Sequence, residues 1–182
     1  MNFTLNNIDI ESQRLKLVRL SKKHVTSEYV SWINDSETNM YLETRGNYSL
    51  DLLSSYIDEK YKNEVFIWAI HRKDSNVHIG NIKIDPIDTK KKTGEYGILI
   101  GDKKSWGKGF AKEATIRILK YCFYKLNLRK ITLGVIEENL KAISLYKNIG
   151  FTIDKINKDV GVYNNKLCNA VRMSIHINDF KQ

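Results

Sequence analysis

The chain has 182 residues, of which 42% are hydrophobic, so we expect residues 1–182 to form a single domain with one substantial core. The formal net charge of +9 would suit a polyanion, but lysines and arginines are spread along the chain and only Lys90–Lys92 form a tight run. A solvated basic surface is therefore favoured over a nucleic-acid footprint, and part of the charge could serve a smaller anion.

Several other classes of protein are disfavoured by composition. The N-terminus lacks the basic and apolar segments of a signal peptide, and no apolar run approaches the roughly 20 residues of a membrane span, so we expect a soluble, cytoplasmic protein. Two cysteines, Cys122 and Cys168, cannot build a disulfide framework or a zinc cluster. The four histidines show no ligand spacing, so no metal is expected.

The predicted elements begin with a strand over Ser12–Leu20, where leucines alternate with charged residues. A helix is expected over Ser21–Asn34, with Ser21 as its N-cap, and a second over Leu50–Tyr61, where apolar residues recur at helical spacing. Strand, helix and helix thus open the fold.

A hairpin is expected next, formed by Phe66–His71 and His78–Ile84, because both runs are rich in β-branched and aromatic residues and are separated by a polar turn. A polar loop through Pro86 then leads to a strand over Glu95–Ile100. Together these segments predict a three-stranded meander.

The clearest helical pattern runs from Phe110 to Leu126, with apolar residues three and four apart. Strands and helices alternate from there to the end, which indicates a mixed α/β sheet. The remaining predicted elements are strands over Lys130–Val135, Phe151–Ile156 and Ala170–Ile177, and a helix over Leu140–Ile149 that ends at Gly150.

The segment Ile98–Ala111 predicts a strand, a glycine-containing loop and a helix start. Such a loop directs backbone N–H groups and the positive end of the helix dipole at one point, which makes an anion site. The Walker pattern is absent, and the Rossmann pattern fails because Lys112 occupies the position of its last glycine. What remains is a basic residue at Lys104 followed by Gly107 and Gly109, and on this motif alone a simple turn is an equal alternative.

A second motif follows about 30 residues later. It consists of Asn139, Ala142, Tyr146 and the pair Gly150-Phe151. Both motifs together closely resemble the GNAT superfamily of N-acetyltransferases, and the resemblance covers roughly Leu15 to Ile177. Lys104 is a departure, since Gln or Arg is usual there, but a side-chain donor is retained.

The resemblance implies an α/β fold of the GNAT type, with a mixed, mostly antiparallel sheet of about six or seven strands and about four helices. It implies acetyl-CoA as the acyl donor and CoA as a product. Backbone amides from Ser105 to Phe110 would hold the pyrophosphate, Leu99 and Ile100 would pair with the pantetheine arm, and Asn139 would anchor that arm or serve as an N-cap. The implied CoA-binding residues are Ile98, Leu99, Ile100, Lys104, Ser105, Trp106, Gly107, Lys108, Gly109, Phe110, Ala111, Asn139, Ala142 and Tyr146.

Catalytic roles are implied in the same way. Tyr146 matches the position that protonates the departing sulfur, although an aromatic on a helix can also be core. Backbone N–H groups at Leu99 or Ile100 would stabilise the oxyanion. Glu95 is the expected catalytic base, with an exposed strand-end charge as an equal alternative, and His78 is a weaker candidate.

The acceptor amine is less constrained. Ser12–Leu17 and Trp32–Asp35 resemble the RimJ/RimL-type branch, and Tyr41–Arg45 with Gly80–Ile84 resemble bacterial members linked to amino-sugar nucleotides. We therefore expect acetyl transfer by direct attack in a ternary complex to a small-molecule amine such as a nucleotide-linked amino sugar. A protein N-terminus as acceptor, a non-catalytic acyl-CoA sensor, a homodimer and the identity of the base stay open. The candidate acceptor contacts are Trp32, Arg45, Tyr48 and Asn81, with Trp32 in the core and Arg45 on the surface as alternatives.

Overall fold

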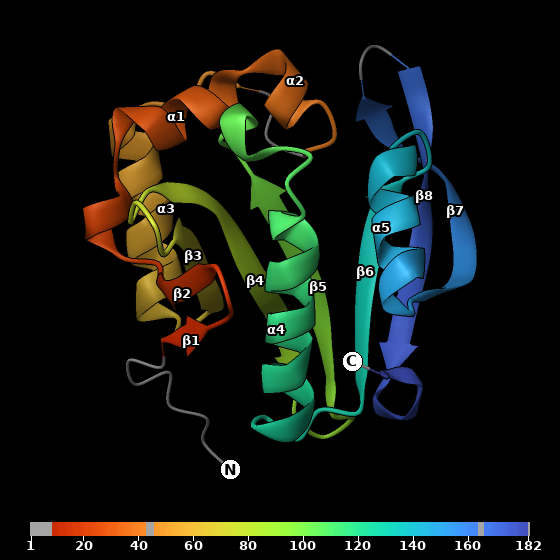
Figure 1. The fold of residues 1–182 in the computed structure, drawn as a ribbon. Helices are drawn as coiled ribbons and strands as arrows, with labels where there is room; N and C mark the ends of the chain where they lie inside the picture. Colours follow the sequence, from red (N-terminus) through yellow and green to blue (C-terminus); the bar gives the residue numbers. More distant parts are fainter. Residues whose placement is uncertain (1–8, 43–45, 164–165, 182) are drawn as a thin grey trace.

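A computed structural model describes residues 9–42, 46–163 and 166–181. These residues form an eight-stranded sheet with the strand order β1-β2-β3-β4-β5-β6-β8-β7 (Figure 1). Every neighbouring pair is antiparallel except β5 and β6, which run parallel. The elements are β1 (Ile10–Glu11), β2 (Leu15–Arg19), α1 (Ser27–Asn34), α2 (Ser36–Asn39), α3 (Leu50–Lys62), β3 (Phe66–Arg72), β4 (His78–Asp88), β5 (Thr93–Ile100), α4 (Phe110–Tyr124), β6 (Lys130–Ile136), α5 (Leu140–Ile149), β7 (Thr152–Tyr163) and β8 (Lys166–His176).

The mixed, mostly antiparallel sheet expected from the sequence is confirmed, and α5 has the predicted bounds. One strand more than expected comes from β1, whose two residues are too few to give an alternation pattern. No helix in the described ranges is long and apolar enough to cross a membrane. Cys122 and Cys168 are both buried and free.

Several expected boundaries are wrong, and β7 and β8 are both longer than predicted. The helix predicted over Ser21–Asn34 is a 3-10 turn at Lys22–His24 followed by α1, because the Thr26 side chain accepts the Tyr29 N–H and starts a new helix. The loop predicted through Pro86 is instead part of β4, which continues past that proline with a shift of register between Ile84 and Ile87.

Helices cover both faces of the sheet and give two cores. On one face, Trp68, Ile82 and Leu133 pack with residues of α4 and α5. On the other face, Ala69 and Ile67 pack with residues of α1 and α3. Alternate residues of a strand point to opposite faces, so neighbouring positions of β3 serve different cores.

The sheet opens at its centre. β5 and β6 pair only from Thr93 to Glu95, and beyond Glu95 the two strands diverge. The edge of β5 from Tyr96 to Ile100 therefore faces a gap in the sheet and not a neighbouring strand. This divergence is what positions the candidate site.

Candidate active site

A cleft of about 700 Å³ lies at the divergence of β5 and β6. Its walls are residues Tyr96–Ile100 of β5 and Gly134–Ile136 of β6, with α5 on one side and tyrosines of the α1–α3 region on the other. Such a cavity is large enough for a drug-sized ligand or a cofactor arm.

The glycine loop lies at the end of β5, directly before α4. Gly107 and Gly109 have φ angles of 72° and 78°, a region that favours glycine. The N–H groups of Ser105 and Trp106 are already bonded to carbonyls of Asp102 and Lys103. Within the described chain, the N–H groups from Gly107 to Phe110 have no such partner, so the donors left for an anion begin at Gly107.

The loop is braced by residues that sequence patterns do not reveal. Arg14 donates to the Lys108 carbonyl at 3.0 Å, forms an ion pair with Glu113 at 2.6 Å and lies over the Phe110 ring. The Trp106 indole N–H donates to the Ile100 carbonyl at 2.7 Å. Arg14 is 99 residues from Glu113 in sequence, so only the fold brings them together.

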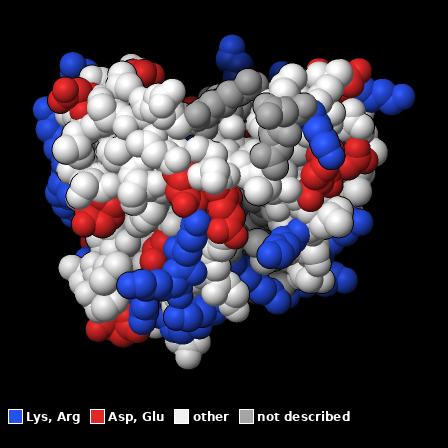
Figure 2. All heavy atoms as spheres, turned by 90° about the horizontal axis from the view of Figure 1, so that it is seen from above, with Lys and Arg blue, Asp and Glu red and all other residues white. Residues whose placement is uncertain are grey.

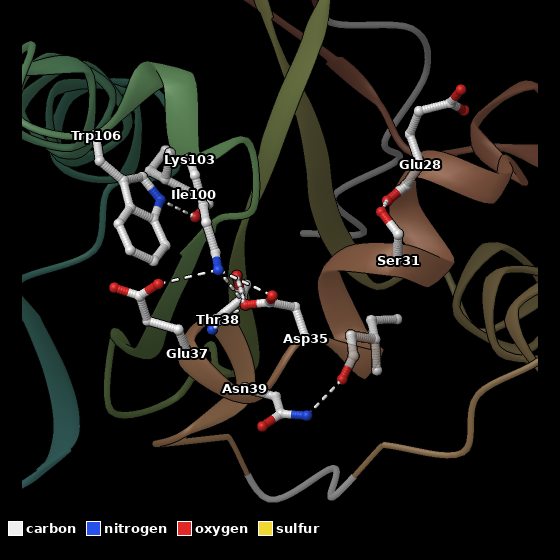
Figure 3. A network of polar contacts seen from close by, with 10 residues as sticks. Glu28, Ser31, Asp35, Glu37, Thr38, Asn39, Ile100, Lys103 and Trp106 are labelled. Carbon is white, nitrogen blue, oxygen red and sulfur yellow. Dashed lines mark hydrogen bonds and ion pairs between the residues drawn. The ribbon is translucent and has the colours of Figure 1, made fainter.

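A polar network joins the same loop to the α1–α2 region (Figure 3). The Lys103 ammonium contacts Asp35 at 2.8 Å and Glu37 at 2.9 Å. The Lys103 hydrogen bond, together with the Thr38 N–H, lowers the pKa of Asp35 to about 2. Seen from this end of the molecule, lysine and arginine side chains gather beside a few carboxylates on one part of the surface (Figure 2).

Helix α5 brings three predicted residues to the cleft: Asn139, Ala142 and Tyr146. Asn139 is the N-cap, because its side-chain oxygen accepts the Ala142 N–H at 3.2 Å. The rings of Tyr96 and Phe151 hold the Tyr146 ring, with centroids 5.8 and 5.7 Å away. Burial raises the pKa of Tyr146 to about 12, so its hydroxyl stays protonated at neutral pH.

Glu95 lines the cleft where β5 and β6 begin to separate. Its two oxygens accept from the Arg172 guanidinium at 2.6 and 2.7 Å, and the Thr132 hydroxyl donates to one of them. A carboxylate offers about four acceptor positions, so one is left for a ligand or water. Arg172 was missed by the sequence analysis, since its place opposite Gly134 depends on the pairing of β6 with β8.

The predicted acceptor contacts are divided. Tyr48 and Asn81 line the cleft. Trp32 does not line it, since its ring lies against Gly101 and meets the His78 ring edge-to-face with centroids 4.9 Å apart. Arg45 lies outside the described residues. Five further tyrosines, which were not predicted as acceptor contacts, also line the cleft: Tyr29, Tyr41, Tyr56, Tyr96 and Tyr163.

His78 is half-buried beside the cleft in a cluster with His24 and His71, with ring centroids 5.2 Å from each. Burial lowers the pKa of His78 to about 4, so the ring is neutral at physiological pH. Its Nε2 lies 2.9 Å from the Gly80 carbonyl and 3.1 Å from Asn81 Oδ1. No group of three potential ligand residues in the described chain has the geometry to hold a metal ion.

Comparison with known proteins decides the family. The family model described as an acetyltransferase (GNAT) domain matches residues 14–152, most of the chain. The chain belongs to the GNAT acetyltransferase family. It is accordingly an acetyl-CoA-dependent acyltransferase, and its eight-stranded α/β sheet is a GNAT fold.

Individual relatives agree with this GNAT assignment. The uncharacterized N-acetyltransferase p20 of Bacillus licheniformis is 26% identical over 91% of this chain and 93% of the relative. A spermidine N(1)-acetyltransferase of Vibrio cholerae is 41% identical, but over 40% of this chain and 42% of the relative. The crystal structure of spermidine N-acetyltransferase from Vibrio cholerae, in complex with CoA and spermine, superposes with a TM-score of 0.85, 24% identity and coverage of 94% of this chain and 100% of that one.

Proposed function

We propose that this GNAT enzyme transfers an acetyl group from acetyl-CoA to the primary amine of a small molecule, by direct attack in a ternary complex. The observation that carries the proposal is that Tyr146 and Glu95 both line one cleft, which lies beside the open edge of β5. A nucleotide-linked amino sugar is the proposed acceptor class, and a RimJ/RimL-type relationship is part of the same proposal.

The residues of the loop fit acetyl-CoA. A Cβ built on Gly107 would meet no protein atom within 4 Å, so the space beside this glycine is open to a ligand. The unpartnered N–H groups from Gly107 to Phe110 would hold the pyrophosphate at the start of α4. The open edge of β5 would hydrogen-bond the pantetheine arm, and Asn139 would reach it through the side-chain amide nitrogen that capping leaves over.

The chemistry requires an unprotonated amine, a stabilised oxyanion and a protonated leaving group. The bound acetyl-CoA supplies the thioester that the amine attacks. We assign removal of the amine proton to Glu95, directly or through water, and oxyanion stabilisation to the N–H of Leu99 or Ile100. Tyr146 would donate its phenolic proton to the departing sulfur. Tyr96 and Phe151 would fix the Tyr146 ring in place for this step.

The charge of the cleft favours an amino sugar over a polyamine. Its charged lining residues, as far as the chain is described, are Lys83, Glu95 and Arg172, and Glu95 is already paired with Arg172. A polycation would meet an excess of positive charge there. Tyrosine and asparagine side chains offer neutral hydrogen bonds and ring faces, which suit a hydroxyl-rich acceptor.

The test is acetyl-CoA consumption, read as free thiol released, with amino sugars and their nucleotide-linked forms, N-terminal peptides, spermidine and aminoglycosides as acceptors. Saturable turnover of one class is expected, and Tyr146→Phe should lower kcat about 100-fold or more. Tyr121→Phe is the matched control, since it removes a buried phenol from α4 outside the cleft. Binding of acetyl-CoA with no turnover of any amine would refute transfer to these acceptor classes and favour an acyl-CoA sensor.

Spermidine is the second candidate acceptor, because relatives named spermidine N(1)-acetyltransferase match parts of this chain. A protein N-terminus remains the other alternative. Preferred turnover of spermidine or of peptides in the same panel would select between them. We keep the cytoplasm as the proposed location and a homodimer as the proposed assembly.

A further inference from the structure

The orientation of the Asn81 side-chain amide is set by His78. A backbone carbonyl can only accept, so the contact of His78 Nε2 with the Gly80 carbonyl requires a proton on Nε2. The Asn81 atom 3.1 Å from the same nitrogen must then be the accepting oxygen, which turns Nδ2 the other way. His78 thus fixes which end of the amide is free.

The free end of that amide lacks a partner. Asn81 is 6% exposed and lines the cleft, and its Nδ2 is buried with no hydrogen bond to any described residue. Leaving a buried donor unsatisfied costs about 1–3 kcal/mol, so such atoms are rare outside sites that bind a ligand. Asn81 Nδ2 therefore points to a hydrogen-bond acceptor on a bound molecule.

Lys83 lies on the same face of β4, two residues further along. Its aliphatic chain crosses Gly97 of β5, where an added Cβ would lie 3.2 Å from Lys83 Cε. No carboxylate of the described residues lies within ion-pair distance of its ammonium. Since Glu95 is occupied by Arg172, Lys83 gives this wall of the cleft an uncompensated positive charge.

We propose that Asn81 and Lys83 together recognise an anionic group, a phosphate or a carboxylate, carried by the amine acceptor, and that His78 is the positioning residue for Asn81. This inference rests on the proposed acetyl transfer to a small molecule. Either anion has several acceptor oxygens, so one can take the Asn81 N–H while another pairs with Lys83. A polycationic acceptor would offer neither interaction.

The experiment compares matched acceptors with the full chain: glucosamine with glucosamine 6-phosphate for the phosphate arm, and an amino acid with its amide for the carboxylate arm. The anionic member of one pair should have the higher kcat/KM. Lys83→Met keeps the methylenes over Gly97 but removes the charge, and should reduce that preference about tenfold through KM of the acceptor. Lys83→Arg should restore it, and Lys62→Met, on the exposed end of α3, should keep it.

Asn81→Asp and His78→Phe test the neutral donor. Each should raise the KM of the anionic acceptor with a smaller effect on kcat. Asn81→Asp removes the N–H donor and His78→Phe removes the contact that orients it, while the reacting groups stay in place. If His78 had only a structural role, His78→Phe would lower thermal stability and kcat but would leave the preference for the anionic acceptor unchanged. Thermal unfolding of each variant, measured alongside, shows whether the fold is kept.

Binding separates this inference from the proposed function. If no amine is acetylated, but glucosamine 6-phosphate still binds by calorimetry and Lys83→Met weakens it, the transferase proposal fails and the anion site stands. Equal effects of Lys83→Met on both members of each pair would overturn the inference. So would a rise in the KM of acetyl-CoA alone, or no preference for an anionic member in either turnover or binding.

Discussion

At the scale of single residues, the Glu95 carboxylate presents the sharpest question, because Arg172 and Thr132 already donate to it. If Glu95 is the base, Glu95→Gln should lower kcat by about 100-fold or more. The amide is nearly isosteric but cannot take up the amine proton. The measurement is kcat of each variant at saturating acetyl-CoA and acceptor.

The control for this prediction is Thr132→Val, which removes a hydrogen bond to Glu95 and keeps the carboxylate. It should lower kcat by much less than Glu95→Gln does. If kcat of Glu95→Gln stays within a few-fold of kcat of the unaltered enzyme, Glu95 is not the base. Its role would then be to hold Arg172 across the sheet.

Residues with local signals were the ones that the sequence could place. Asn139 and Gly150 are a helix cap and a helix end, and their conformations agree with that expectation. Arg14 and Arg172 carry no such signal, because their contacts depend on which strands become neighbours. The unpaired N–H of the Asn81 amide is still harder to predict from sequence. It follows only when the contacts of His78 Nε2 with the Gly80 carbonyl and with Asn81 Oδ1 are both known.

At the scale of elements, a substitution in the loop before α4 should affect protein stability and acetyl-CoA affinity to different degrees. Gly107→Ala puts a Cβ into empty space at φ 72°, so the folded protein should lose only about 1–2 kcal/mol of stability from backbone strain. The same Cβ would stand where the pyrophosphate is proposed to bind. The affinity for acetyl-CoA should therefore fall at least about tenfold in calorimetric titration.

Asn127→Ala is the control for Gly107→Ala. Asn127 also has a positive φ, 53°, but it follows the C-terminal end of α4, whereas Gly107 precedes the N-terminal end of that helix. It should cost stability with little change in acetyl-CoA affinity. Unaltered affinity in Gly107→Ala would place the pyrophosphate elsewhere.

Element types were predictable where a period or a cap was strong, and boundaries were less so. The apolar period of α4 and the β-branched runs of β3 and β4 gave the right type of element. The break before α1 was missed because Ser21 and Thr26 both offer caps, and each starts its own short helix. Pro86 argued for a loop, yet a register shift lets β4 continue through it.

At the scale of the whole molecule, β7 is an edge strand with exposed apolar side chains. Ile153, Ile156 and Val160 are 45%, 50% and 43% exposed, and Leu167 of the neighbouring β8 is 60% exposed. Exposed apolar edges tend to pair with another chain. We propose that two copies associate along β7, so the unaltered protein should be a dimer by size-exclusion chromatography with light scattering.

Ile156→Lys should convert such a dimer to a monomer, because it places a charge in the middle of the apolar edge. Leu52→Lys is the matched control, since Leu52 is equally exposed at 51% but belongs to α3, which packs against β3 in the half of the sheet opposite β7. A monomer for the unaltered protein at micromolar concentration, or equal effects of both variants, would contradict the proposal.

The buried histidines make the stability of the whole domain depend on pH. Burial lowers the pKa of His24 to about 3 and that of His78 to about 4, both below the ordinary value of 6.5. Between pH 6.5 and 4 the unfolded chain therefore binds more protons than the folded one, and stability falls with acid. Each histidine should contribute about 2 kcal/mol of loss between pH 7 and pH 5.

The measurement is urea unfolding at pH 7 and pH 5. His24→Asn should reduce the difference by about half, because one of the two buried imidazoles is gone while the amide can still accept the Ser21 N–H that His24 accepts. His176→Gln removes an exposed imidazole and should leave the difference as it is. The depressed pKa of Asp35, about 2, cannot produce the effect, since that carboxylate stays ionised at both pH values. Equal stability at pH 5 and pH 7 would mean that the histidine cluster opens to water and accepts protons without unfolding the domain.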